Sequence, residues 1–284
     1  MVYFFYFFLF IFGLAVGSFI NVISIRYKPG KRLLSEDIIR GRSQCLDCKK
    51  KLSWIDLVPF LSFFIQKGKC RYCKGKLSLQ YPIIEILGGL AFVFIPFYLA
   101  SQPWLIIVSW LFIFSLFLLL SVIDFRISII PDQINLLLAA LGLVLTSLKN
   151  YYGAFGLFSG SFLRHFAAVF GWREEIWLNC VFAAFVGLII FLLIVVLSKG
   201  KAMGWGDVKL VAALGLIFGW PDIVMILILA FVIGAVVSVV LMLVGTKDIK
   251  DMIPFGPFLI IASTITFFFG YQIIDAYFKL FGLV

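Results

Sequence analysis

The sequence predicts an all-α polytopic membrane protein, with about eight transmembrane helices and a small cytoplasmic loop domain resembling a zinc ribbon. Three observations carry this prediction. The chain is 63% hydrophobic and only 13% charged, whereas soluble domains are about 25% charged. Apolar runs of membrane-crossing length recur along it, and two Cys-x-x-Cys pairs lie in its one long polar loop. This composition excludes a soluble enzyme, a disordered protein and a secreted disulfide scaffold.

The apolar runs define the transmembrane helices, because crossing about 30 Å of hydrocarbon takes roughly 20 residues. The sixth of eight runs is short and Gly-rich, which suits a partly re-entrant segment. Its boundary with the seventh lies at Trp220-Pro221-Asp222. The eight expected spans are residues 3–25, 82–100, 104–124, 131–148, 178–198, 206–219, 221–244 and 254–278.

The distribution of basic residues orients these spans. With the N-terminus outside, 20 of the 24 Lys and Arg residues fall on the cytoplasmic side, as the positive-inside rule requires. Residues 1–18 resemble a secretory signal but lack a positive amino-terminal region. We therefore expect a first transmembrane helix over 1–25, with Gly13 and Gly17 packing against another helix. A cytoplasmic zinc-binding domain follows over 26–81, and a transmembrane domain over 82–284.

The loop 26–81 contains an internal repeat, Cys-x-x-Cys-Lys-x-Lys-Leu-Ser, that begins at Cys45 and again at Cys70. Two such knuckles can present four thiolates to one tetrahedral Zn²⁺. Four protein ligands close the coordination shell, so the zinc is structural. Disulfides or a redox motif are the alternatives, and the reducing cytoplasm disfavours a disulfide. The expected ligands are Cys45, Cys48, Cys70 and Cys73, while Cys180 is a buried, inert thiol.

Two aspartates lie at the cytoplasmic ends of predicted spans. Asp124 ends the third span and Asp207 opens the sixth, so the two can meet at one depth. Two carboxylates that share a site do not both ionise readily, which leaves one acid and one base. Such a pair can activate water against a peptide carbonyl. Gly204 and Gly206 would let a substrate strand approach the backbone, and Lys209 would tune the pair or contact substrate.

Simpler roles compete with this interpretation. Asp132 follows Pro131 at the start of a helix, where an N-terminal cap is the simplest role. Asp207 would in the same way cap its own helix, and Asp124 would pair with Arg126. The residue types alone leave these readings about as probable as a catalytic pair.

Several ordered motifs carry a resemblance to the bacterial type IV prepilin peptidases, membrane aspartic proteases of the GxGD type. The resemblance runs through nearly the whole chain, which makes it far more specific than GxGD alone. The motifs are Gly17-Ser-Phe-Ile-Asn21-Val with Arg26, Arg42-Ser-Gln-Cys45, the second Cys-x-x-Cys, Leu77-Ser-Leu-Gln-Tyr81-Pro82-Ile-Ile-Glu85, Asp124 to Asp132, Ala202-Met-Gly-Trp-Gly-Asp207-Val-Lys209 and Pro254-Phe-Gly256-Pro257-Phe.

The resemblance implies an activity and its residues. Such enzymes cleave the basic leader of type IV prepilins and pseudopilins after a glycine, with Asp124 and Asp207 as the catalytic pair. Many members also N-methylate the new N-terminus with S-adenosylmethionine, an activity tied to the N-terminal part and here to the zinc loop, Glu85 and Gly89. The resemblance places the protein in the bacterial inner membrane. Candidate contacts for a basic leader are Glu36, Asp37, Asp47 and Asp56.

Two other function classes remain open. Intramembrane aspartates also form ion pathways, although no inverted repeat is visible here. A basic zinc loop also binds nucleic acid weakly at low salt, but we expect no specific nucleic-acid partner. The expected partners are prepilins or pseudopilins and the lipid bilayer. The long outside segment 149–177 suits an interfacial helix that places His165 at the lipid headgroups.

Overall fold

The computed structural model describes residues 2–33, 35, 38, 41–153, 161–168, 175–201, 203–245 and 253–282. The chain forms two compact units. Unit 1 comprises residues 1–101 and 110–123, and unit 2 comprises residues 102–109 and 124–284.

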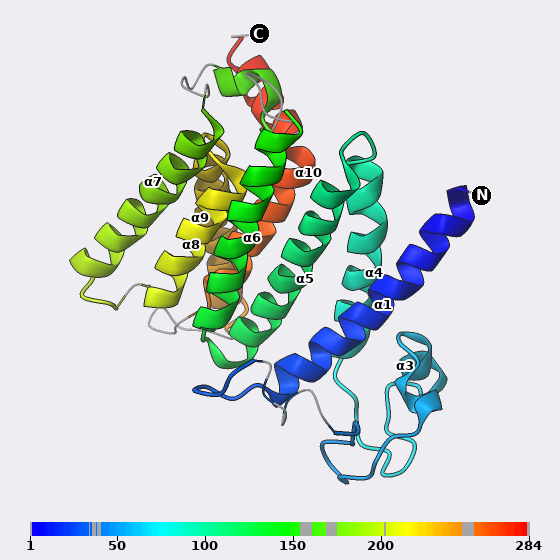
Figure 1. Cartoon of the computed structure of the whole chain (residues 1–284). Helices are drawn as coiled ribbons and strands as arrows, with labels where there is room; N and C mark the ends of the chain where they lie inside the picture. The colour runs from blue at the N-terminus through cyan, green and yellow to red at the C-terminus, as the bar shows by residue number, and fades with distance from the viewer. Residues whose placement is uncertain are drawn as a thin grey trace. The chain divides into compact units, whose positions relative to one another are not determined.

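The described residues are almost entirely helical, which confirms the all-α membrane class (Figure 1). Seven helices are long and apolar enough to cross a membrane. Phenylalanine, leucine and valine side chains stand exposed along them, as lipid contact requires. These helices are α1 (Val2–Arg26), α4 (Gln80–Tyr98), α5 (Trp104–Ile127), α6 (Asp132–Tyr151), α7 (Ile176–Leu197), α9 (Asp222–Leu243) and α10 (Gly256–Leu280).

The expected sixth span, 206–219, differs from the other seven. It corresponds to α8 (Trp205–Phe218), whose 14 residues are too few to cross the hydrocarbon alone. The helix packs against α6 and α7, and Leu210, Val211 and Leu214 on it are completely buried. A Cβ on Gly215 would lie 2.5 Å from the backbone of Ala184 in α7. The expected sixth span is therefore a short helix that is buried between α6 and α7 in unit 2.

In unit 1, α1 and α4 pack together through glycines, as expected for Gly13 and Gly17. A Cβ on Gly17 would lie 2.6 Å from the carbonyl oxygen of Ile84, and one on Gly88 would lie 2.6 Å from that of Gly13. The buried Asn21 fastens one end of the pair, because its amide donates to the carbonyl of Tyr81 over 3.2 Å. These contacts place the end of α1 beside the start of α4.

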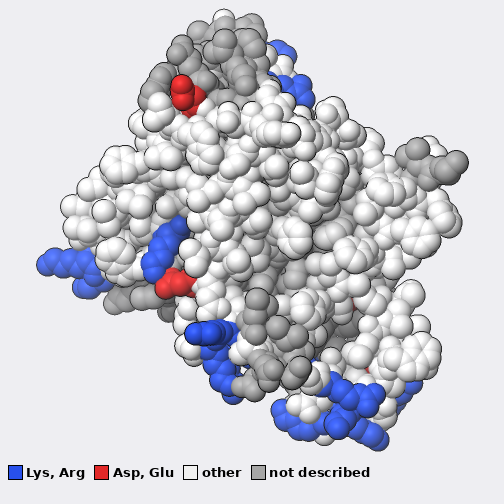
Figure 2. Space-filling view, viewed as in Figure 1, with Lys and Arg blue, Asp and Glu red and all other residues white. Residues whose placement is uncertain are grey.

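The polar loop of unit 1 contains two short helices, η1 (Trp54–Leu57) and α3 (Leu61–Ile65). The Lys and Arg side chains that the structure describes in this loop are exposed, and Figure 2 shows blue groups along the lower edge of the molecule, the largest at the lower right. In unit 2, the expected interfacial helix appears as a single 3₁₀ turn, η2 (Arg164–Ala168). There His165 contacts the ring of Tyr271. Within the expected segment 149–177, residues 154–160 and 169–174 lie outside the described residues.

Candidate active site and metal centre

The internal repeat folds into two equivalent knuckles. In the first, the amide of Cys45 donates to the carbonyl of Lys50, and in the second that of Cys70 donates to the carbonyl of Gly75. Matching antiparallel bridges, Gln44 with Lys51 and Lys69 with Lys76, close the two turns. The lysine after each second cysteine has a positive φ, 59° at Lys49 and 61° at Lys74. The repeat in sequence is thus a repeat in backbone geometry.

The two knuckles bring four sulfurs together. The Sγ atoms of Cys45, Cys48, Cys70 and Cys73 all lie within 4.8 Å of one another, and those of Cys45 and Cys73 are 3.8 Å apart. A regular tetrahedron with Zn–S bonds of about 2.3 Å requires sulfurs about 3.8 Å apart. The donor set therefore fits a four-coordinate structural metal.

The protonation of the thiols agrees with this fit. Backbone hydrogen bonds from Cys73 and Tyr72 lower the pKa of the Cys70 thiol to about 7. A backbone hydrogen bond from Gly75 lowers the pKa of Cys73, but desolvation and the neighbouring thiols outweigh it and raise that pKa to about 11. Thiols this close together do not all lose their protons unless a positive charge is present. A divalent cation supplies that charge and displaces the remaining protons, as expected at a metal site.

A buried aspartate organises the segment between the knuckles. The carboxylate of Asp56 accepts hydrogen bonds from the amide and hydroxyl of Ser53, at 3.0 and 2.6 Å, and from the side-chain amide of Gln66 at 3.1 Å. Arg71 lies 3.3 Å from the same carboxylate. Asp56 is thus a structural residue, not an accessible contact for a basic leader. Two other candidates for that contact, Glu36 and Asp37, lie outside the described residues.

In unit 2, Asp124 lies in the last turn of α5 and is 3% exposed. Its Oδ2 accepts a hydrogen bond of 3.1 Å from the amide of Gly256, the first residue of α10. The N–H groups at the start of a helix stabilise negative charge, and Asp124 accepts from one of them. The next residue, Pro257, has no N–H to donate. The carboxylate therefore meets a helix N-terminus that is 132 positions away in sequence.

Asp207 lies in the first turn of α8 and is 8% exposed. Its Oδ2 accepts a hydrogen bond of 3.3 Å from the amide of Gly204, so part of the expected capping role is present. Its Oδ1 is buried and has no hydrogen-bond partner among the described residues, which a cap alone does not explain. The carboxylate also lies close enough to Asp124 for the two charges to repel each other. The structure thus brings together the two aspartates that the sequence singled out.

Asn135 completes the surroundings of Asp207, and sequence reasoning missed it. Its side-chain amide donates to the carbonyl of Gly206 over 3.2 Å, while its own Oδ1 is buried and accepts no hydrogen bond from any residue that the structure describes. A Cβ on Gly206 would lie 2.9 Å from the Cβ of Ile130, whereas one on Gly204 would make only ordinary contacts. Gly206 is therefore needed for packing, and Gly204 leaves room beside the carboxylate. In the sequence, the clue to Asn135 was its position one helical turn after Pro131, close to the start of the helix that carries Asp132.

The predicted capping role of Asp132 is wrong. Pro131 occupies the cap position of α6, and no side chain caps that helix. Asp132 instead forms an ion pair of 2.8 Å with Lys209. Both side chains are largely exposed, so the pair links the first turns of α6 and α8 at the surface.

The two remaining candidates, Glu85 and Gly89, lie on α4 in unit 1. Glu85 is buried, and its Oε2 accepts a hydrogen bond of 2.8 Å from the amide of Phe60 in the loop. Gly89 is buried against α1, where a Cβ would lie 2.6 Å from the ring of Phe10. Gly89 therefore contributes to helix packing, whereas Glu85 connects α4 to the loop.

Comparison with known proteins gives consistent results. A family model described as "Bacterial Peptidase A24 N-terminal domain" matches residues 11–99, and one described as "Type IV leader peptidase family" matches residues 111–239. Curated relatives carry the name prepilin leader peptidase/N-methyltransferase. The protein of Xanthomonas campestris is 29% identical, over 95% of this chain and 93% of its own.

Two further relatives extend this similarity. The protein of Bacillus subtilis is 28% identical over 96% of this chain and 97% of its own. That of Klebsiella pneumoniae is 33% identical over 73% of this chain and 82% of its own. No solved structure matches. With both family models matched in order and relatives aligned along nearly its whole length, the chain belongs to the type IV leader peptidase family.

Proposed function

We propose that this protein is a membrane aspartic endopeptidase that removes the leader peptide from type IV prepilins or pseudopilins. The observation that carries the proposal is the buried carboxylate pair, Asp124 and Asp207, with an oxygen on Asp207 that has no partner in the described part of the chain. Both aspartates lie in the segment that matches the leader peptidase family. An ion pathway through the same carboxylates is the less supported reading, because the relatives are named as peptidases.

The two carboxyl groups would share one proton, because two buried charges at short range repel each other. The ionised carboxylate removes a proton from water, whose oxygen then bonds to the scissile carbonyl carbon. The protonated carboxyl donates its proton to the carbonyl oxygen. When the C–N bond breaks, the amine takes the proton held by the first carboxyl, and the second recovers its own from the collapsing diol. The amides of Gly256 and Gly204 hold both carboxylates throughout.

The substrate follows from the relatives' name. A prepilin leader is short and basic, and by family resemblance cleavage follows a glycine just before the apolar pilin helix. We propose that the N-terminus lies outside the inner membrane and the loop 26–81 in the cytoplasm, on the side where Lys and Arg concentrate. The end of α5 then lies on the cytoplasmic side too, where a basic leader remains before cleavage.

We propose that the four-cysteine cluster holds a structural Zn²⁺, whose binding supplies folding energy to a loop too small for a hydrophobic core. The relatives' name also includes N-methyltransferase. We infer that this chain methylates the new N-terminal amine with S-adenosylmethionine as the methyl donor.

Mass spectrometry of a prepilin-like peptide incubated with the purified protein tests both activities. The wild type should remove the leader, and an added methyl mass should appear only with S-adenosylmethionine present. Cleavage that persists in both Asp124→Asn and Asp207→Asn would refute the aspartic mechanism. If the wild type left a panel of prepilins intact, the transport reading would replace the proposal.

A further inference from the structure

An apolar surface lies between the two knuckles, in a part of the loop that neither the metal centre nor the aspartates use. Five large side chains there are between 41% and 76% exposed, although they lie in the polar loop and outside the seven long helices. Exposed apolar side chains that gather in one place indicate contact with a membrane or a protein. We call this set the docking face: Trp54, Ile55, Leu61, Phe64 and Ile65.

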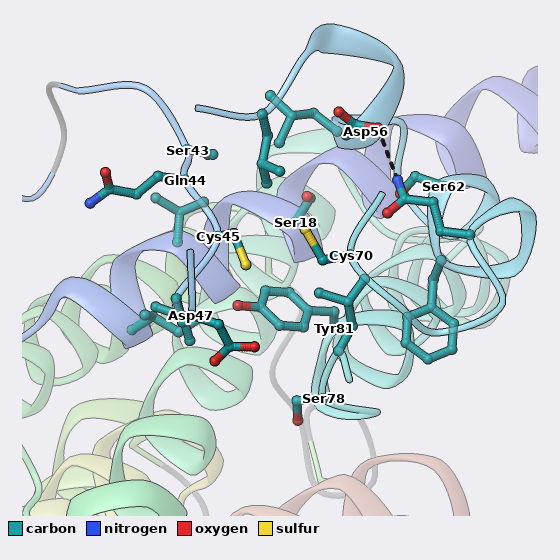
Figure 3. Close-up of a pocket in the computed structure, with 18 of the residues that line it drawn as sticks. Ser18, Ser43, Gln44, Cys45, Asp47, Asp56, Ser62, Cys70, Ser78 and Tyr81 are labelled. Carbon is teal, nitrogen blue, oxygen red and sulfur yellow. Dashed lines mark hydrogen bonds between the residues drawn. The ribbon is translucent and has the colours of Figure 1, made fainter. Parts of the chain in front are cut away.

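The docking face is the outer side of a segment with two different sides. Within α3, Leu61, Phe64 and Ile65 follow the i, i+3, i+4 spacing of a single helix face. The inner side is polar, because Asp56 and Ser62 line a cavity inside unit 1 (Figure 3). Short amphipathic segments of this kind lie in the interface of a membrane, with the apolar side toward the acyl chains.

Contacts between the two short helices join their exposed sides into one surface. Gln66, which follows α3, donates from its side-chain amide to Asp56 in η1 over 3.1 Å, the bond that is dashed in Figure 3. Helices η1 and α3 also contact each other directly. The five apolar side chains are therefore presented together.

A contact with α4 holds the docking face at the level of the bilayer surface. The amide of Phe60, the residue before α3, donates to the carboxylate of Glu85 over 2.8 Å. Glu85 lies in the first two turns of α4, which begins at Gln80. Because α4 is long and apolar enough to cross a membrane, its first turns mark the edge of the bilayer. Helix α3 thus begins beside that edge.

The charge around the docking face favours lipid over protein as its partner. The stretch 49–69 has five lysines and a single acid, Asp56, which is buried against Gln66 and Arg71. Anionic headgroups attract such a cluster of lysines, whereas a basic prepilin leader or a second copy of this loop would be repelled by it. The five lysines are all exposed: Lys49, Lys50, Lys51, Lys67 and Lys69.

We propose that the docking face inserts into the bilayer leaflet on the side of the loop, with the flanking lysines at anionic phospholipid headgroups. Its side chains contact the first carbons of the acyl chains, and Trp54 lies at the headgroup boundary that aromatic residues favour. The knuckles are thereby held at the membrane surface. This contact does not depend on the peptidase or on methyl transfer.

Photolabelling from within the bilayer tests the proposal. The full-length protein is placed in nanodiscs of phosphatidylcholine and phosphatidylglycerol, together with a lipid that carries a diazirine in its acyl chain. After illumination, tryptic cleavage releases the docking face in one peptide, 52–67, and the first knuckle in another, 43–49. We expect roughly tenfold more label in 52–67, because the apolar side of this peptide reaches the acyl chains.

A matched pair of variants tests the face itself. Phe64→Asp and Leu46→Asp each replace an apolar side chain, 58% and 57% exposed, by a charged one. The label is measured on Trp54 and Ile55, which neither variant changes. Phe64→Asp should lower it about fivefold, because a charge among acyl chains is costly, and Leu46→Asp, in the first knuckle, should leave it as in the wild type. Thermal unfolding in detergent shows whether each variant is folded.

The lipid composition tests the role of the lysines. Nanodiscs of phosphatidylcholine alone should give less label in 52–67, because the lysines lose their anionic partners. Equal label in 52–67 and 43–49 of the wild type would overturn the proposal. If a prepilin-like peptide, or a second copy in the same nanodisc, removed the label, the face would belong to that partner and the proposal would be wrong. Cleavage and methylation are measured separately, so their failure leaves this result unchanged.

Discussion

Asp124 and Asp207 each accept a hydrogen bond from a glycine amide at the start of a helix, Gly256 for α10 and Gly204 for α8. Helix N-termini stabilise negative charge, and an asparagine oxygen can accept the same bonds. Replacing either aspartate by asparagine should therefore remove its charge and keep its hydrogen bond to the glycine amide.

We predict that Asp124→Asn and Asp207→Asn each slow leader cleavage by about 10²–10⁴-fold, because the proton transfers lose their acid or base. Initial rates from mass spectrometry check this. Thermal unfolding should stay close to that of the wild type, and a large drop would mean that the loss of activity reflects misfolding.

Asn135 is a positioning residue, because it touches Gly206 and not the reacting atoms. Asn135→Leu leaves the half-buried Gly206 carbonyl without its donor, which costs about 1 kcal/mol. We expect a lower kcat with little change in KM, measured with a prepilin peptide. Leu136→Ala is the control, since Leu136 is the next residue of α6 and is 72% exposed. Equal kcat values for the two variants would contradict the role.

At the scale of elements, the proposed zinc would join the two knuckles through thiolates from both. Replacing any one of Cys45, Cys48, Cys70 or Cys73 by serine should release zinc and loosen the loop, because three thiolates bind it less well. Metal analysis and limited proteolysis between residues 41 and 79 measure both effects. The control is Cys180→Ser, whose sulfur lies in α7 far along the chain. Stoichiometric zinc in the four knuckle variants would disprove the centre.

The glycine contact between α1 and α4 can be tested in the same way. Gly17→Leu forces a side chain against the Ile84 carbonyl and should destabilise unit 1 by about 1–3 kcal/mol. Ala15→Leu, at an exposed position of the same helix, should have little effect. Thermal unfolding in detergent compares the two, and equal melting temperatures would show that the helices do not pack through Gly17.

Elements with a strong local signal were predicted well. The knuckles follow from cysteine spacing, and the long helices follow from their apolar length. Helix α8 was predicted as a short span from its apolar composition, and composition alone did not show that its apolar side chains pack against α6 and α7. Its 14 residues were the available clue.

At the scale of the whole molecule, the basic loop predicts an orientation. Ser101 and Lys201 are both exposed, and the positive-inside rule predicts that the loop at Ser101 lies outside and that at Lys201 in the cytoplasm. We therefore expect a membrane-impermeant maleimide to label Ser101→Cys in intact spheroplasts and to leave Lys201→Cys unlabelled. Wild-type protein treated alike measures the background from the native cysteines. The reverse pattern would invert the topology.

Long-range contacts set the limit of what the sequence predicts. That the two aspartates meet follows from span counting, since both end up at one membrane edge. The donation from Gly256 to Asp124, and that from Asn135 to Gly206, join segments 132 and 71 positions apart. No local pattern encodes such pairs. Asp132 shows the same limit, because its partner Lys209 outweighed a local preference for capping.

The repeated knuckle also fixes how the loop responds to metal supply. Each knuckle provides two of the four thiolates, so neither alone can complete a tetrahedron. The loop should therefore take up its metal in a single step that saturates at one equivalent, with no half-loaded form on the way. We then expect the loop to have two states, metal-free and loaded, with the concentration of free zinc in the cell setting their proportions.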